Sequence, residues 1–300
     1  MTNTDRVGEA PVAPVPSGFP GAAPLHHAAA RRRRFTLVIA VLVAAVLAVS
    51  MAAIMVGAVA VSPGKVARVL SYHLLGWGEP MWTAAEESII WKIRFPRVLL
   101  GLMIGAGLSV VGLAIQAMVR NPIADPFVLG VSSGASLGAV IAIFYAGSLG
   151  GVVPSIGAFL GALGALVVVF VMSQGGGRLS SIRLLLIGVS LSYSLSGVAS
   201  FFLYAAPDAS AKNQILFWIL GSFGAASLSG LWPPLVALVA TLAFLSLRAR
   251  RLNALAVGDE AAIALGVDPH RLRAELLVAT SLFVGASVAA AGPIGFVGLV

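Results

Sequence analysis

Long apolar stretches follow one another along this chain and are separated by short polar segments. A helix that crosses the hydrocarbon core of a membrane needs about 20 mainly apolar residues. By that measure the pattern predicts seven membrane spans, at residues 35–61, 98–119, 127–147, 152–173, 183–204, 230–247 and 274–297. We therefore expect an all-α, polytopic bundle of transmembrane helices.

Composition agrees with this prediction and narrows the chemistry. Of the 300 residues, 59% are hydrophobic and 10% are charged, whereas roughly a quarter of the residues in soluble domains are charged. Cysteine is absent, which excludes disulfides, thiolate metal sites and thiol nucleophiles. The net charge of +8 comes from short basic runs between apolar stretches, so it indicates membrane orientation and not nucleic-acid binding. We expect no metal and no cofactor.

The first 34 residues are rich in Ala, Pro and Gly and lack periodic hydrophobicity. This composition predicts a disordered tail that ends in the four consecutive arginines at residues 31–34. The positive-inside rule places this cluster, and with it the N-terminus, in the cytoplasm. The loops at residues 174–182 and 248–273 then also face the cytoplasm. Residues 35–300 form the predicted transmembrane domain.

The first outside loop, residues 62–97, runs against the positive-inside rule because five basic residues crowd into it. Pro96 suits the first turn of a helix and pushes Phe95 toward an extended shape, so Arg94 should precede the second span and Arg97 should lie in its first turn. A cation there opposes the helix dipole by about 0.3–1 kcal/mol. Two explanations stay open, namely snorkelling to lipid headgroups and docking of an acidic partner outside.

Small residues recur at four-residue spacing within several predicted spans. The third span has Gly130, Gly134 and Gly138, and the fourth has Gly157 and Gly161. Such spacing lets helix backbones approach closely inside a membrane, where no hydrophobic drive brings helices together. We expect a densely packed bundle and assign none of these glycines to a ligand.

The joint "VRNPIADPFVLGVSSGAS" predicts a tight elbow at the inner face. Arg120 suits the negative C-terminal end of the second span, and Asn121 before Pro122 ends that helix. Asp125 can cap the third span, with Pro126 at its first position. We interpret the elbow as structural.

The loop "RARRLNALAVGDEAAIALGVDPHRLR" predicts a short helix on the inner surface. Asp259 and Glu260 suit its first turn and Gly266 suits its end. The residues expected to share one face are Ala261, Ala262 and Leu265. Such a helix either lies in the lipid headgroups or forms a docking surface for a cytoplasmic protein, and its alanines and acidic start favour docking.

Two kinds of energy-coupling group are missing from the sequence. The acidic residues nearest to the predicted spans lie at span ends or in loops; they are Asp125, Asp208 and Glu275. A proton-coupled carrier would be expected to bury such a group. None of the three lysines, Lys65, Lys92 and Lys212, completes a phosphate-binding G-x-x-x-x-G-K-[ST] loop. Uphill transport would therefore need energy from another polypeptide.

Several stretches together resemble one family. They are "IRFPRVLLGLMIGAGLSVVGLAIQAMVRNPIADPFVLGVSSGAS", "RLLLIGVSLSYSLSG", "FWILGSFG", "LNALAVGDEAAIALGV" and "AGPIGFVGLV". In this order they are similar to the FecCD-type permeases of binding-protein-dependent ABC importers for iron-siderophore complexes, haem and vitamin B12. The resemblance covers most of the chain from residue 90 onward.

The resemblance implies a half-transporter in the bacterial inner membrane that pairs with itself or with a close paralogue. Cytoplasmic P-loop ATPase subunits would hydrolyse ATP, so the chain itself would not be an enzyme, and an extracytoplasmic substrate-binding protein would deliver the cargo. We expect a ferric siderophore as cargo, with haem or vitamin B12 as alternatives. An ion-coupled secondary transporter and a non-transporting membrane scaffold are the rival interpretations.

The resemblance also implies roles for particular residues. Arg94 and Arg97 match the arginine pair that docks the binding protein. The residues that match the ATPase-coupling segment are Leu252, Leu255, Gly258, Asp259, Glu260, Ala261, Ala262, Leu265 and Gly266. Family members continue beyond "GFVGLV" with further spans, so we expect the sequence to be truncated at its C-terminal end.

Overall fold

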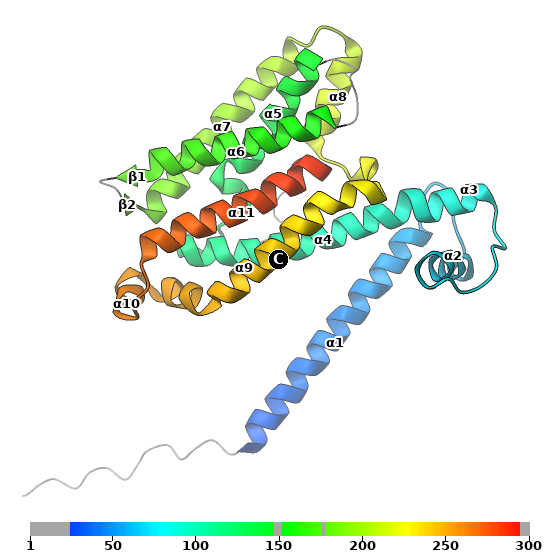
Figure 1. Cartoon of the computed structure of the whole chain (residues 1–300), viewed down its shortest axis with the longest axis horizontal. Coiled ribbons are helices and arrows are strands. Elements are labelled where there is room, and N and C mark those ends of the chain that lie inside the picture. Colours follow the sequence, from blue (N-terminus) through cyan, green and yellow to red (C-terminus); the bar gives the residue numbers. More distant parts are fainter. Residues whose placement is uncertain (1–24, 147–151, 176–177, 295–300) are drawn as a thin grey trace, which may run out of the picture. The chain divides into compact units, whose positions relative to one another are not determined.

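The computed structural model describes residues 25–146, 152–175 and 178–294, and most of them are helical (Figure 1). In chain order the elements are α1 (Leu25–Met55), α2 (Pro63–Leu75), α3 (Ala84–Glu87), the π-helix η1 (Ser88–Arg94), α4 (Phe95–Val119), the 3-10 helix η2 (Pro126–Leu129), α5 (Val131–Ala146), α6 (Val153–Ser173), β1 (Gln174–Gly175), β2 (Arg178–Leu179), α7 (Ser181–Tyr204), α8 (Ala209–Leu220), the 3-10 helices η3 (Phe223–Ala225) and η4 (Leu228–Leu231), α9 (Trp232–Val257), α10 (Asp259–Ala264) and α11 (Pro269–Ala291). The chain divides into two compact units, Met1–Ala52 and Ala53–Val300.

The all-α prediction is confirmed, and the seven predicted spans correspond to six long helices and one shorter one. Within the described residues, the stretches long and apolar enough to cross a membrane are Arg31–Met55, Ala84–Val119, Val153–Ser173, Ser181–Tyr204, Leu228–Val257 and Pro269–Ala291. The predicted third span, 127–147, is α5, which has only 16 residues. It starts late because η2 comes first and Gly130, with φ of 77°, separates the two helices.

The predicted tail is too long at its C-terminal boundary. Residues 25–34 lie in the first turns of α1, and residues 1–24 lie outside the described residues. Alanine and arginine are among the best helix formers. Adding a residue to an existing helix is easier than nucleating one, so the helix of the apolar run extends back through the arginine cluster.

Two helices were missed by the sequence analysis because both are shorter than a span. In the outside loop, α2 buries Val66 and Val69 in a small cluster with Ile90. Between α7 and α9, α8 has 12 residues, and its N-cap Asp208 accepts a hydrogen bond from the N–H of Ala211 at 2.7 Å. A helix of this length does not cross a membrane.

The second span begins earlier than predicted. Thr83 and Glu86 form a capping box at the start of α3, and α3, η1 and α4 run on as one helix of 36 residues. The prediction of an extended Phe95 is wrong, because its φ and ψ are −59° and −47° and its N–H donates to the carbonyl of Ile90. That five-residue step is the π-type bond. The wide turn accommodates Pro96, which cannot donate and whose ring would crowd a regular helix.

Close glycine packing joins α5 to α6, as the small-residue pattern predicts. A methyl group at Gly134 or Gly138 would overlap the backbone carbonyl of Gly161 or Gly157, respectively. At the centre of the bundle, α11 packs against α4, α5, α6 and α9 (Figure 1). There the buried ring of Phe283 occupies the space that a side chain at Gly107 would need.

The residues of the second unit define two ends of the bundle. We call the end at which α4 and α9 finish and α7 and α11 begin the inner end, following the orientation predicted from the arginines. The carbonyl of Met118 accepts a hydrogen bond from Ser181 there, which ties α4 to α7. At the opposite, outer end, the N–H of Ser222 donates to the carbonyl of Ala291 at 2.7 Å.

Candidate functional site

Arg94 does not lie on an open outer surface, contrary to the prediction that it docks a partner. Its side chain is 9% exposed. The guanidinium donates to the carbonyls of Ile54 at 2.7 Å, Met55 at 3.1 Å and Val59 at 2.6 Å. Carbonyls in the last turn of a helix lack partners within it and carry partial negative charge. Arg94 therefore caps the end of the first helix.

Arg97 lies where the prediction placed it, on the exposed outer end of α4. Its guanidinium donates one hydrogen bond, at 3.1 Å, to the carbonyl of Gly224 in η3. A guanidinium has five N–H donors, and Arg97 is exposed. The predicted arginine pair is therefore split into a buried structural member and an exposed one.

An aromatic stack supports this outer end. The ring of Trp91 in η1 stacks on His73 of α2, with centroids 4.4 Å apart, and on Phe95, with centroids 4.8 Å apart. The Nε2–H group of His73 donates to a carboxylate oxygen of Glu87 at 3.1 Å. The stack holds α2 against the π-helix. In the sequence its only signal is the four-residue spacing of Trp91 and Phe95.

The predicted elbow is present at the inner end of α4. Arg120 ends the helix with φ of 56°, the one positive value among the described non-glycine residues. The side chain of Asn121 accepts a hydrogen bond from the N–H of Ile123 at 3.1 Å. Asp125, 3% exposed, accepts one from the N–H of Phe127 at 2.8 Å. Asp125 thus caps the 3-10 helix η2, and not the third span as predicted.

The predicted ATPase-coupling segment comprises the end of α9, α10 and the turn after it. Its predicted members that are buried, and so fix it to the bundle, are Leu252, Leu255, Gly258 and Ala262. The predicted shared face is wrong, because Ala262 is buried whereas Leu265 is 71% exposed. The reason is that α10 ends at Ala264 after six residues, so Leu265 leaves the helical register.

Three large apolar side chains project from this segment. Val257 is 77% exposed, Ile263 is 63% exposed and Leu265 is 71% exposed. We call these three residues the inner patch. Glu260 and Gly266 are exposed beside it, and Ala261 is half-buried. Sequence reasoning had named only Leu265 of the three.

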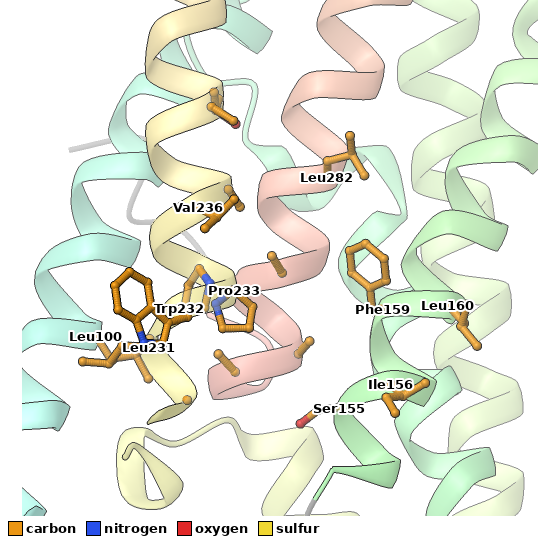
Figure 2. Close-up of a pocket in the computed structure, with 18 of the residues that line it drawn as sticks. Leu100, Ser155, Ile156, Phe159, Leu160, Leu231, Trp232, Pro233, Val236 and Leu282 are labelled. Atoms are coloured by element: carbon orange, nitrogen blue, oxygen red, sulfur yellow. The ribbon is translucent and has the colours of Figure 1, made fainter. Parts of the chain in front are cut away.

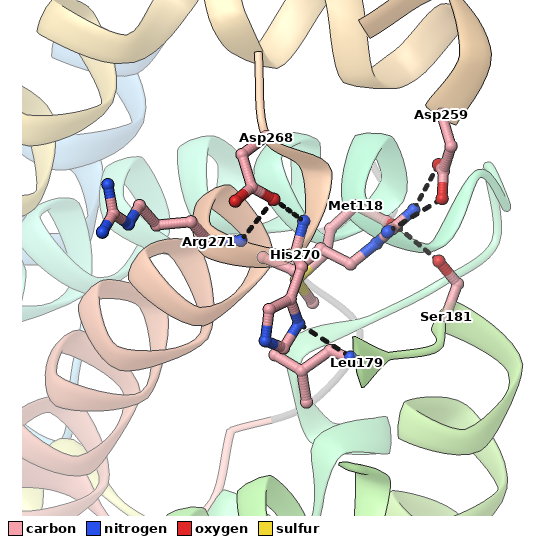
Figure 3. A network of polar contacts seen from close by, with 8 residues as sticks. Met118, Leu179, Ser181, Asp259, Asp268, His270 and Arg271 are labelled. Carbon is pink, nitrogen blue, oxygen red and sulfur yellow. Dashed lines mark hydrogen bonds and ion pairs between the residues drawn. The ribbon is translucent and has the colours of Figure 1, made fainter. Parts of the chain in front are cut away.

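A network of polar contacts holds α10 in place (Figure 3). The guanidinium of Arg273 in α11 donates to both carboxylate oxygens of Asp259, at 2.6 Å and 3.0 Å. This bond holds the pKa of Asp259 below its ordinary value, with the charge of Arg120 adding to the effect. The same Arg273 directs its Nε toward the carbonyl of Met118, 3.5 Å away. Neither contact was predicted, since no local pattern connects these positions.

The start of α11 is fixed in a similar way. Asp268 caps it by accepting from the N–H groups of His270 and Arg271, at 2.9 Å and 3.2 Å. The bond from Arg271 is the main cause of the lowered pKa of Asp268. The ring of His270 in turn accepts, through Nδ1, from the N–H of Leu179 in β2 at 2.8 Å (Figure 3).

Comparison with known proteins identifies the framework that carries these features. Residues 42–300 match the FecCD transport family. The chain belongs to the FecCD transport family. It is 39% identical over 236 residues to the vitamin B12 import system permease protein BtuC of Vibrio cholerae, covering 76% of this chain and 70% of that protein. It is 37% identical to the hemin transport system permease protein HmuU of Yersinia pestis, covering 73% of this chain and 68% of that protein.

A solved structure agrees with these relatives. It is described as an inward-facing conformation of a metal-chelate type ABC transporter. The match has a TM-score of 0.74 and 28% sequence identity, and it covers 88% of this chain and 79% of that one. This FecCD chain is accordingly a permease of an ABC importer, with several membrane-spanning helices.

An apolar groove runs along the permease between α6, α9 and α11, with a volume of about 1720 Å³ (Figure 2). Phe159 and Leu282 line one side, and Trp232 and Val236 of α9 line the other. A surface this apolar suits lipid or another helix better than a polar chelate. Within the described residues, no group of three or more His, Asp or Glu residues gathers to hold a metal.

One acidic residue lies on this groove. Glu275 of α11 pairs with Arg248 of α9 at 2.9 Å, and both side chains are about one third exposed. The sequence analysis placed Glu275 at a span end, and in the structure it lies in the second turn of α11. This ion pair makes Glu275 a structural link between α9 and α11.

Proposed function

We propose that this permease takes up an iron chelate, a ferric siderophore, in an importer driven by ATP. Haem and vitamin B12 are the competing cargoes, and both stand in the names of its relatives. The metal-chelate type transporter of similar fold supports an iron chelate. The groove described above does not identify the cargo, because its lining is almost entirely apolar.

The inner patch is the observation that carries the proposal of an external ATPase. Three large, exposed apolar side chains within residues 257–265 are what a site that binds another protein would present. The inner patch lies on the short segment between α9 and α11, next to the acidic start of α10. We infer that a cytoplasmic P-loop ATPase binds there, two copies serving a pair of permease subunits. The arginines at residues 31–34 support a cytoplasmic N-terminus.

At the outer end we retain Arg97, and not Arg94, as the site that docks a substrate-binding protein. Arg97 is exposed, and the nearby Lys92 is exposed as well. Exposed ion pairs contribute about 0–1 kcal/mol each. Charges of this kind act mainly on partner choice and on the rate of encounter. Arg97→Glu should therefore weaken docking most at low salt, and equal docking of both forms at every ionic strength would remove the assignment.

Copurification tests the ATPase site. Ile263→Asp and Leu265→Asp place a charge in the inner patch and should reduce the amount of ATPase that copurifies with the permease in detergent. Met81→Asp is the matched control, because Met81 is 72% exposed at the outer end, and it should leave the complex intact. An undiminished complex in both inner variants would refute the inner patch as the docking surface.

Uptake measurements test the cargo. The permease, its ATPase and its binding protein should be reconstituted in vesicles and given ferric siderophore or haem labelled with radioiron, or cobalamin labelled with radiocobalt. We expect ATP-dependent accumulation of the siderophore, with the other two failing to compete. Preferred uptake of cobalamin or haem would refute the siderophore as cargo and leave ATP-driven import standing. Uptake driven by an ion gradient without nucleotide would refute the ATP-driven importer itself.

A further inference from the structure

We propose that Arg273 is a positioning residue that joins α10 to the inner ends of α4 and α7, so that movement of α10 is passed to those two helices. This inference rests on the proposed function, since it assigns a route to the movement that a bound ATPase would impose on the inner patch.

The first support is the geometry around Arg273. Its side chain is 3% exposed, although an arginine is costly to bury. Both ends of its guanidinium fork meet the two oxygens of Asp259, at 3.0 Å and 2.6 Å. A paired, two-pronged contact of this kind fixes orientation as well as distance. Asp259 is the first residue of α10, so the contact defines where α10 begins.

The second support is the carbonyl of Met118. The left-handed turn at Arg120 ends α4, and carbonyls in the last turn of a helix have no partner within it. This carbonyl accepts from the hydroxyl of Ser181 at 3.0 Å and faces the Nε of Arg273 at 3.5 Å. Ser181 is the first residue of α7. The ends of α4 and α10 therefore meet at the buried guanidinium of Arg273 in the second turn of α11, and the start of α7 joins them through the carbonyl of Met118.

The third support is the elbow, which approaches the same point from another side. Gly258 precedes α10 with φ of 144°, and a methyl group there would lie 3.4 Å from the guanidinium of Arg120. The charge of Arg120 also acts on the carboxylate of Asp259. The joint between α9 and α10 is thus confined between the elbow and Arg273. We call Asp259, Arg273, Met118 and Ser181 the inner clasp.

A gain in stability does not by itself explain why Arg273 is buried and paired with Asp259. Removing an arginine from water offsets much of its attraction to a carboxylate, and apolar replacements of buried ion pairs are often as stable. What an apolar residue could not supply is a directed link to α10 and α4 at once. The inner clasp should therefore affect the position of α10 more than it affects folding.

Spin-label distances test that position directly. The chain contains no cysteine, so Leu265→Cys and Ile123→Cys provide one label after α10 and one in the elbow, both at exposed sites. The distance distribution should be narrow in the parent chain and should broaden with Arg273→Gln. Arg271→Gln, an exposed arginine two positions away in α11, is the matched control and should leave the distribution narrow. An equally narrow distribution in Arg273→Gln would overturn the proposal.

Transport supplies the functional test, in vesicles that contain the permease, its ATPase and its binding protein. Arg273→Gln should still copurify with the ATPase, because the inner patch is intact, while cargo accumulated per ATP hydrolysed falls roughly five-fold or more, the lower range of coupling between distinct sites. Asp259→Asn should lower the same ratio, and the double variant should be no worse than either single one. If Arg273→Gln does not fold, Ser181→Ala decides, with a smaller fall in the same ratio.

The outcomes separate this inference from the proposed function. A parent chain that transports with ATP, together with an Arg273→Gln variant of unchanged ratio, overturns the inference and leaves the proposed function standing. If Arg273→Gln and Asp259→Asn each lower the amount of cargo accumulated per ATP hydrolysed and their effects add in the double variant, the inference is also overturned. A parent chain that accumulates none of the three cargoes with ATP overturns both.

Discussion

Adding one methyl group at Gly161 should separate α5 from α6. The new Cβ would lie 2.9 Å from the Cα of Gly138 and 3.0 Å from the carbonyl carbon of Gly134, and it would overlap the Gly134 oxygen. Ordinary van der Waals contact begins near 3.4 Å. Neither backbone can rotate away as a side chain would, so the two helices must move apart by at least half an ångström.

Gly164→Ala is the matched control, because it makes the same change on the same helix, one residue short of a full turn away. Among the residues that the structure describes, none lies within 4 Å of a Cβ at Gly164. Glycine to alanine within a helix is itself favourable by roughly 0.5–1 kcal/mol, and this gain is common to both variants. Their difference in stability therefore isolates the packing.

Overpacking of this kind costs about 1–3 kcal/mol, since a gap of half an ångström or more also weakens the other contacts along the seam. We expect Gly161→Ala to melt several degrees below Gly164→Ala. Tryptophan fluorescence or size-exclusion chromatography after heating, both in detergent, would measure the difference. Equal melting temperatures would refute the close α5–α6 contact.

Three further outcomes follow from the polar contacts. Arg94→Gln removes a charged donor from three carbonyls and should lower the free energy of unfolding by at least about 2 kcal/mol. Arg97→Gln should change it by no more than about 0.5 kcal/mol. Equal melting temperatures of the two variants would contradict the assignment of Arg94 as structural and Arg97 as a surface residue. Asp125→Ala should lower the free energy of unfolding by about 1–2 kcal/mol because it removes the cap of η2, and Asp125→Asn should lower it by less. A larger loss in Asp125→Asn would contradict the assignment of Asp125 as a cap. Because the contact with Arg273 lowers the pKa of Asp259, its contribution is present above the unfolded pKa, near 3.9, and is lost only as the pH falls through the lower folded value. The stability deficit of Asp259→Asn should then stay constant between roughly pH 5 and 8, and a deficit that disappears within that window would count against the ion pair.

The sequence predicted those parts of the fold that depend on local composition. Apolar length located the spans, and small residues such as Gly138 and Gly157 predicted that helices pack closely, although the structure was needed to show that α5 and α6 are the partners. The residues of the turn predicted the elbow, because Asp125 followed by Pro126 is typical of the start of a helix. Each of these signals lies within a few neighbouring residues, so one chain without an alignment is enough to read it.

What the sequence could not supply depends on residues that are distant along the chain. Arg94 looked like a surface charge, and only the carbonyls of Ile54 to Val59 around it show that it is a cap. In the same way, Arg273 is one of several arginines in a basic loop until Asp259 is seen to face it. Irregular backbone was also missed, since the π-helix at Ser88–Arg94 lets a helix continue through a proline that normally marks a start.

The long helix that contains α4 has a mechanical consequence. Its irregular π turns lie outward of Arg97, so regular α-helix extends without interruption from Arg97 to Met118. At 1.5 Å per residue that is a strut of roughly 30 Å, about the thickness of the hydrocarbon core. A stiff strut tilts as a whole instead of bending, and a tilt of about 5° would shift one of its ends by 2–3 Å relative to the other. A force applied at the outer end of α4 is therefore transmitted directly to its inner end, at the opposite face of the membrane.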